Sequence, residues 1–405
     1  MPLLAVFDDV GWWSGANDSD CGGPFRTGIG RDHCVADYHA LADLGKRLGM
    51  RVQAAMILCE WDHQDILREL PTATWMGKAW DNSRWRGPWL DEAAHVLRAN
   101  APYIEIVLHG VGHEYWEDGV MTRAEWEDMN GHMRPRDQIE RHVDYFGRLM
   151  EMNGLGPFPV SFVPAAFRYT YSGDCSAMAG LLARCGVRYV STPFRMMTGA
   201  ELVKGRLYGD EDGVMTVDRG SDPIGWDSIG KCPTGDIPDP ICGLHWPNIL
   251  HPNPERNGEN VDAWAKLLQG IGARPDRVLS ADTRACWTQL AYHENAKTRV
   301  DRNTIVVSLE GARGIQRKIL NDWFYIKVSC ADALEFSSDD LEIRSVTRDQ
   351  ANGTYLAALS HSEGEFSEGH VRFDQHRQAD SGHDHTDQPA RHQGKQAAGR
   401  SDFDA

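Results

Sequence analysis

PLLAVFDD, residues 2–9, is the stretch that decides the expected fold. Residues 2–7 are apolar and fit a buried strand, and two carboxylates, Asp8 and Asp9, follow at once. Function in β/α folds sits at the carboxyl ends of strands. Of two such acids, one can ligate a cation while the other acts as a base. In isolation, an acidic turn or a helix N-cap is the simpler explanation.

Downstream of this segment, short apolar runs alternate with amphipathic stretches for about 250 residues. The pattern predicts strands at 51–58, 103–108, 159–163, 188–191 and 241–245, and helices at 32–48, 137–152 and 174–185. Gly49 follows the first helix as a stop signal. Repeated β–α alternation implies parallel strands, arranged as a barrel or as an open sheet.

A tryptophan-rich insert at about 62–98 separates the second and third strands. Trp75, Trp80, Trp85 and Trp89 recur in it at nearly regular spacing. We expect an inserted helical segment whose tryptophans pack onto the main domain, since buried aromatic residues mostly belong to a core. The alternative is a sugar-stacking wall beside the site.

The pattern changes near residue 300. Apparent strands at 305–310, 323–329, 341–349 and 354–360 predict a small β-rich appendage over 301–360. Residues 361–405 are rich in His, Gln and Asp and nearly devoid of apolar side chains. Such a segment cannot bury enough surface to offset its chain entropy, so we predict a disordered tail.

The composition of the chain indicates which classes of partner and which cellular compartment to expect. The net charge of −17 disfavours nucleic acid and anionic lipid, and predicts a neutral or cationic small substrate. Nine scattered cysteines without a CxxC pair suit a reducing compartment. No apolar run of membrane-spanning length occurs, and the first strand begins at residue 2, so we expect no signal peptide and a cytoplasmic protein.

Three further strand ends carry candidate functional residues. HGVGH, residues 109–113, places His109 and His113 four residues apart, where both can meet one ion, although chance alone produces such pairs. FVPAAFR, residues 162–168, follows the next strand. His245 ends an apolar run and is either a core histidine or a general acid.

The order of these pieces resembles the polysaccharide deacetylase (NodB-homology) superfamily. The pieces are, in order, FDD, a strand-end HxxxH, a proline-containing strand end, DPIGW at 222–226 and a late Leu-His pair. The resemblance covers roughly residues 1–255. The resemblance implies an α/β fold, a distorted (β/α)7 barrel, which we place over residues 1–300. It also implies roles for single residues: Asp8 as general base, Asp9, His109 and His113 as ligands of Zn²⁺ or another divalent metal, His245 as general acid, and Trp226 with Asp222 in the acyl pocket.

This chain departs from the family pattern in the long spacing between Asp9 and His109, caused by the tryptophan-rich insert, and at two motifs. Gly110 stands where the family usually has Ser or Thr, which removes a hydroxyl beside the metal ligands. Phe162 and Val163, instead of an arginine, precede Pro164, and we expect Arg168 to supply the missing charge.

The expected substrate pocket and reaction follow from the same resemblance. The expected pocket is formed by Pro164, Arg168, Asp222, Trp226 and Trp246. His251 is an alternative to His245 as the general acid. The implied function is metal-dependent removal of an acyl group from an N-acetylated sugar or a sugar-containing small molecule. Two alternatives remain open: a C–N hydrolase of the same fold acting on a non-sugar or cyclic amide, and a catalytically silent carbohydrate-binding barrel.

Overall fold

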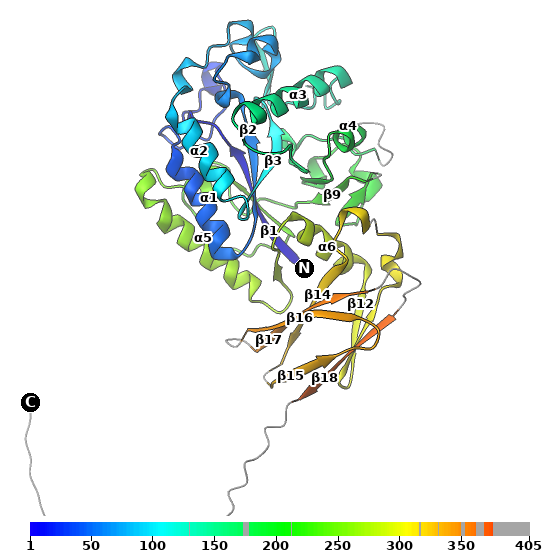
Figure 1. Cartoon of the computed structure of the whole chain (residues 1–405). Helices are drawn as coiled ribbons and strands as arrows, with labels where there is room; N and C mark the ends of the chain where they lie inside the picture. Colours follow the sequence, from blue (N-terminus) through cyan, green and yellow to red (C-terminus); the bar gives the residue numbers. More distant parts are fainter. Residues whose placement is uncertain are drawn as a thin grey trace, which may run out of the picture.

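A curled, mostly parallel sheet forms the centre of the N-terminal part of the chain (Figure 1). The computed structural model describes residues 1–128, 130–172, 178–211, 213–315, 317–330, 332–349, 353–361 and 368–375. The strands follow the order β10-β1-β2-β3-β6-β7-β9-β8, with β11 beside β1, and all pairs are parallel except β8–β9. Their bounds are β1 Pro2–Val10, β2 Val52–Ile57, β3 Ile104–Gly110, β6 Ser161–Phe162, β7 Tyr189–Thr192, β8 Tyr208–Asp210, β9 Met215–Asp218, β10 Ile241–His245 and β11 Val278–Leu279.

The sheet is curled into a half barrel. Among the described residues its two outer strands, β10 and β8, are not paired with each other. The expected mixed α/β class is therefore confirmed, whereas seven β/α units closed into a barrel are not established by this sheet.

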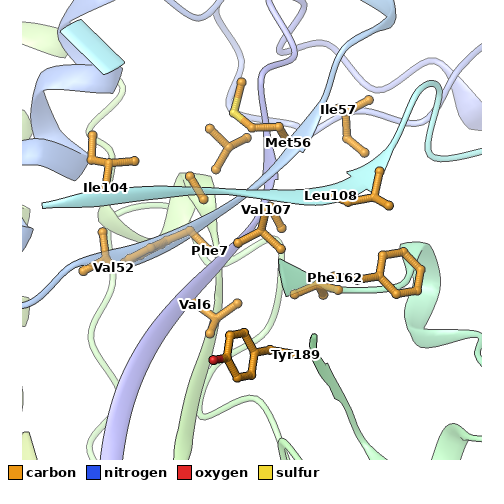
Figure 2. Close-up of a cluster of buried hydrophobic side chains, with 14 of the residues drawn as sticks. Val6, Phe7, Val52, Met56, Ile57, Ile104, Val107, Leu108, Phe162 and Tyr189 are labelled. Atoms are coloured by element: carbon orange, nitrogen blue, oxygen red, sulfur yellow. The ribbon is translucent and has the colours of Figure 1, made fainter. Parts of the chain in front are cut away.

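The first three strands are largely buried, and most of the residues on both of their faces are apolar. Every residue of β1 and β2 is buried, as parallel strands covered on both faces require. Figure 2 shows side chains from neighbouring strands meeting in one core, among them Phe7, Met56, Leu108, Phe162 and Tyr189. Full burial of one such side chain stabilises the fold by about 1.5–3 kcal/mol.

Helices connect the strands and cover the sheet. Their bounds are α1 Val35–Leu48, α2 Pro88–Ala99, α3 Arg136–Met152, α4 Met178–Arg184, α5 Asn257–Gly272 and α6 Thr283–Asn295. α1 packs against α2 and α5 (Figure 1). It ends at Gly49, which adopts a left-handed φ of 60°, so the predicted stop is confirmed. The first residues of the helix predicted at 174–185 lie outside the described residues.

The tryptophan-rich insert forms short 3₁₀ turns, Ile66–Glu69, Pro71–Ala73, Gly77–Ala79 and Ser83–Trp85, followed by α2. Trp80 is fully buried and donates from Nε1 to Asp62 Oδ2 at 3.0 Å. Trp75, Trp85 and Trp89 are partly buried against the main core. The four tryptophans therefore pack onto the main domain, as expected.

The C-terminal part consists of two antiparallel sheets, ordered β12-β13-β18-β15 and β14-β17-β16. Their bounds are β12 Lys297–Asp301, β13 Thr304–Ser308, β14 Trp323–Ser329, β15 Leu334–Ser337, β16 Glu342–Asp349, β17 Thr354–Ser360 and β18 Glu368–Gln375. The prediction of disorder from residue 361 onward is wrong for β18, which pairs with β13 and buries Val371. The rest of the predicted tail, 362–367 and 376–405, lies outside the described residues.

This β-rich part packs on the end of the curled sheet near the N-terminus (Figure 1). Lys327 Nζ donates to the carbonyl oxygens of Gly272, Arg274 and Arg277 at 2.6–2.9 Å. On α6, the ring of Tyr292 stacks on Phe324, with centroids 4.4 Å apart. None of the described helices is long and apolar enough to cross a membrane.

Candidate active site

The carboxyl ends of β1, β3 and β10 bring the predicted residues together at one edge of the sheet. Asp8 and Asp9 lie near the end of β1, His109 lies in β3, and His245 closes β10. In a regular strand, Asp8 and Asp9 would point to opposite faces. The backbone of Asp9 instead has a φ of 62°, and the β1–β2 register shifts between Phe7 and Val10. This irregularity lets both acids serve one site.

Asp9, His109 and His113 form a buried group that could hold a metal ion. Asp9 Oδ1 lies 3.4 Å from His109 Nε2 and 3.5 Å from His113 Nε2. One ligand atom from each residue lies within 4.8 Å of the others. Asp9 Oδ1 and His109 Nε2 are buried without a hydrogen-bond partner, which is costly unless something else occupies the space between them. Two imidazoles and one carboxylate are a donor set that suits Zn²⁺.

The ring of His109 is fixed by its second nitrogen. His109 Nδ1 donates to the carbonyl oxygen of Val163 at 2.7 Å, which leaves Nε2 facing Asp9. Burial alone would lower the pKa of His109, but Asp9 and Asp8 outweigh burial and raise it. Burial alone would raise the pKa of Asp9, but His113, His109 and His245 hold it well below its usual range. A cation at Nε2 would take the place of the proton on His109.

His113 is kept neutral by its surroundings. Burial and the neighbouring guanidinium of Arg123 hold the pKa of His113 well below its usual value. Arg123 Nη1 donates to His113 Nδ1, so the ring proton resides on Nε2. Ligation through Nε2 therefore requires Arg123 to release Nδ1, so that the proton can move there.

Glu125 holds the loop that carries His113, and sequence reasoning missed it. Its carboxylate accepts from the backbone N–H groups of Val111, Gly112 and His113 at 2.9–3.1 Å. It also contacts His142 Nδ1 at 2.8 Å. A Cβ atom at Gly110 would lie 2.2 Å from Glu125 Oε2. The glycine that departs from the family pattern thus makes room for a carboxylate that orders the loop.

Backbone strain is concentrated at the site. Asp9, His113, Ala166 and Phe167 all have positive φ values, between 53° and 70°. Each such residue costs on the order of 1–3 kcal/mol, and strain of this kind clusters where function needs a fixed geometry. Ala166 and Phe167 lie in the turn after β6 and line the cavity described below.

Arg219 supplies the positive charge beside Asp8. Its Nη1 donates to Asp8 Oδ1 at 3.0 Å and its Nη2 lies 2.8 Å from Asp8 Oδ2. Nε and Nη2 also donate to Asp222 Oδ1 at 3.2 and 3.1 Å. Burial alone would lower the pKa of Arg219, but Asp8 and Asp222 raise it above its usual value.

The expectation that Arg168 supplies this charge is wrong. Arg168 is exposed, whereas Arg219 is fully buried next to Asp8. Arg219 directly follows β9 and stands three residues before Asp222. Its position between a strand end and DPIGW was a usable signal, but the family pattern directed attention to the neighbourhood of Pro164.

His245 occupies the position of the expected acid. Its Nε2 lies 3.9 Å from Asp9 Oδ2, and its Nδ1 is buried without a hydrogen-bond partner. His251 instead contacts Asn253 through Nδ1, away from this group. The structure therefore brings His245, rather than His251, to the other site residues.

A cavity of about 610 Å³ lies at this edge of the sheet. Its lining includes Asp8, His109, His113, Asp222, Trp226 and His245. Trp226 is 38% exposed, and its ring packs on Phe25 with centroids 4.8 Å apart. None of the four tryptophans of the insert is part of the described lining, so the alternative of a sugar-stacking wall there is not supported.

Three residues expected in the pocket are not part of the described lining: Pro164, Arg168 and Trp246. Trp246 is fully buried, and its ring stacks on His33 with centroids 4.2 Å apart. Pro164 begins the turn whose next residues reach the cavity. Trp246 directly follows His245, but its side chain is buried in the core and does not reach the cavity. A position next to a strand-end residue therefore does not by itself bring a side chain into the site.

Comparisons with known proteins give no family for this chain. Neither a protein-family model nor a curated protein matches the sequence. Among solved structures, a bacterial fucosidase crystallised with a pyrrolidine-triazole inhibitor aligns over 94% of each chain, at 10% sequence identity and a TM-score of 0.28. A similarity at this TM-score carries no inference about fold or function.

Proposed function

We propose that this protein is a metal-dependent N-deacetylase acting on an N-acetylated sugar or a sugar-containing small molecule, on a distorted (β/α)7 barrel of the polysaccharide deacetylase type. The observation that carries the proposal is the buried Asp9-His109-His113 group, with two unpartnered ligand atoms, beside Asp8 and His245 in one cavity. Metal ligands, a carboxylate and an imidazole are groups that metal-dependent amide hydrolysis uses.

The metal would be held by Asp9, His109 and His113, and Zn²⁺ fits this mixed nitrogen and oxygen donor set. When bound, the cation supplies Lewis acidity toward the amide carbonyl and toward water. His109 is already oriented for this role by its Nδ1 contact with Val163 O. The carboxylate of Glu125 fixes the backbone from which His113 projects.

Asp8 would act as the general base. It lines the cavity, and its pairing with Arg219 fixes the position of the carboxylate. A carboxylate held there can accept a proton from the attacking water. Arg219 is a positioning residue because Asp8 and Asp222 take up its hydrogen bonds.

His245 would protonate the departing amine. Its side chain is 14% exposed and lines the same cavity as Asp8. Amide cleavage stalls unless the nitrogen receives a proton as the C–N bond breaks. The products would be acetate and a primary amine.

The test is acetate release from a panel of N-acetylhexosamines, cyclic ureides and simple N-acetyl amines. The protein is stripped with a chelator and then reloaded with Zn²⁺. We expect turnover of an N-acetylhexosamine only after reloading, and a loss of about 10²–10⁴-fold in kcat for Asp8→Asn. His251→Ala serves as the control and should retain activity.

The panel also separates the alternatives. Turnover restricted to cyclic ureides would favour the cyclic-amide hydrolase. Sugar binding without turnover, and unaffected by Asp8→Asn, would favour the silent binding protein.

A further inference from the structure

Two guanidinium groups line the cavity, and neither forms an ion pair with a carboxylate of the described lining. Arg123 and Arg195 both line it. The two carboxylates of the described lining, Asp8 and Asp222, are both paired with the buried Arg219 instead. Arg123 has an acidic neighbour, Glu114, whereas Arg195 is exposed and pairs with no carboxylate in the described structure, so it can attract a negatively charged ligand to the cavity.

We propose that the substrate carries an acidic group, a carboxylate or a phosphate, in addition to its N-acyl group, and that Arg195 with Ser221 binds it. This inference rests on the proposed function and specifies its substrate class. It reverses the expectation of a neutral or cationic substrate, which was drawn from the net charge of −17. The charge of the whole chain does not determine the charge of one cavity.

Arg195 is anchored at one nitrogen. It lies in the turn Phe194–Met196, just after the carboxyl end of β7, so it shares the sheet edge with the catalytic candidates. Its Nη1 donates to Gly220 O at 2.6 Å and to Ser221 Oγ at 3.0 Å. In the described part of the chain, Arg195 forms no ion pair, and its Nε and Nη2 donate to no protein acceptor. Two such donors match the two oxygens of a carboxylate or a phosphate.

Acidic side chains nearby are already engaged. Asp218 Oδ1 accepts from the backbone N–H groups of Phe194 and Gly220 at 3.1 and 2.9 Å. Asp239 Oδ2 accepts from the backbone N–H of Ser221 at 3.1 Å. Neither carboxylate forms an ion pair with Arg195 in the described structure, and neither is part of the described lining. Both hold the Arg195–Ser221 edge in place.

Arg123 adds positive charge on the side of the metal ligands. Its guanidinium lies 3.5 Å from the centroid of the Phe25 ring, and Glu114 Oε1 is 3.8 Å from its Nη1. Because Arg123 also contacts His113, its substitution would alter the metal site as well as the charge. Arg195 contacts Gly220 and Ser221 and, in the described structure, none of Asp9, His109 and His113, so its substitution isolates the anion-binding effect.

The experiment is isothermal titration of the Zn²⁺-loaded full chain with three matched sugars: N-acetylglucosamine, its 6-phosphate and N-acetylglucosaminuronic acid. We expect at least one charged sugar to bind about tenfold or more tightly than the neutral one, and Arg195→Gln to remove most of that preference. The control is Arg168→Gln, the same change at an exposed arginine outside the described lining, which should keep the preference. The two charged sugars distinguish a carboxylate from a phosphate.

Equal binding of neutral and charged sugars, a preference that survives Arg195→Gln, or no binding of any of the three would overturn the inference. Acetate release is measured in parallel. Charged sugars that bind with the expected preference but release no acetate would overturn the proposed function and leave the anion site standing. Acetate release from the neutral sugar at the same rate as from the charged sugars would overturn the anion site and leave the proposed function standing.

Discussion

Asp8 and His245 are register partners on the adjacent parallel strands β1 and β10. Neighbouring strands lie about 4.8 Å apart, so the backbone itself fixes the separation of the proposed base and the proposed acid. Asp9, the next residue of β1, approaches His245 Nε2 to 3.9 Å through Oδ2. Three groups of the site thus depend on one strand pair in the buried centre of the sheet.

Loss of Arg219 should destabilise the fold through Asp8 and Asp222. Arg219→Met removes a fully buried cation and leaves both carboxylates without it. Removing one partner of a buried ion pair costs about 3–5 kcal/mol, and we expect a loss in that range by urea denaturation. The double variant Asp8→Asn/Arg219→Met should recover part of it. A cost below about 1 kcal/mol would contradict the pairing.

Glu125→Gln should weaken metal binding while keeping the fold. The amide retains one oxygen for the backbone N–H groups of the His113 loop and places an amino group where the second oxygen stood. Substitution of groups that orient metal ligands lowers metal affinity by about 10–100-fold, and we expect that range for Zn²⁺. Glu117→Gln, an exposed change at the end of the short strand β4 (Tyr115–Glu117), is the matched control. Unchanged Zn²⁺ affinity in Glu125→Gln would show that Glu125 does not position the metal ligands.

Gly11→Ala should be among the more damaging small substitutions. Gly11 follows β1 with a φ of 113°, and a Cβ atom there would lie 2.4 Å from Ile57 O. Strain and clash together should cost at least about 2 kcal/mol in the free energy of unfolding. Gly258→Ala in α5 meets nothing within 4 Å and should instead stabilise the protein by about 0.5–1 kcal/mol. Equal effects of the two variants would show that the turn after β1 is not constrained.

Glu105 should make stability depend on pH. Burial raises the pKa of this carboxyl above 4.5, despite hydrogen bonds from Ser161 and Thr283. The protonated form is therefore favoured in the fold, and its stabilisation, complete below pH 4.5, is lost as the pH rises through the raised value. Each unit of elevation corresponds to about 1.4 kcal/mol.

The measurement is urea denaturation of wild type and Glu105→Gln between pH 4 and pH 8, roughly spanning this window. The variant should gain stability relative to wild type as the pH rises. Glu92→Gln, an exposed change on α2, controls for the altered charge and should show little such trend. A difference between wild type and Glu105→Gln that does not vary with pH would contradict the prediction.

Residues 2–9 predicted the first strand and the two acids because apolar runs and strand-end polar residues are local signals. The same holds for the strands at Val52–Ile57, Ile104–Gly110 and Ile241–His245, each of which overlaps its predicted range. His109 and His113 were selected by their position after a strand, and the structure places both beside Asp9. Local patterns were sufficient here because the sheet is parallel and its carboxyl ends coincide at one edge.

Arg219, Glu125 and Arg195 were not predicted, because their roles depend on contacts between distant segments. Arg219 reaches Asp8 across 211 residues of sequence, and Glu125 reaches the 109–113 loop from the segment after the short strand β5 (Val120–Thr122). Strand β18, which lies between β13 and β15, was missed because its sequence, EGHVRFDQ, is mostly polar and lacks the run of apolar residues expected of a core strand. Charge placement within the cavity likewise depends on the tertiary fold.

The central claim is that Asp9, His109 and His113 hold a metal ion, and metal content tests it most directly. The full chain is saturated with Zn²⁺, desalted and measured by inductively coupled plasma mass spectrometry. We predict about one tightly bound equivalent in wild type and in the control His251→Ala, and strongly reduced metal in Asp9→Asn and His109→Ala, with all four proteins folded by circular dichroism. A wild-type protein that retains no metal, or an Asp9→Asn variant that retains as much as wild type, would contradict the account.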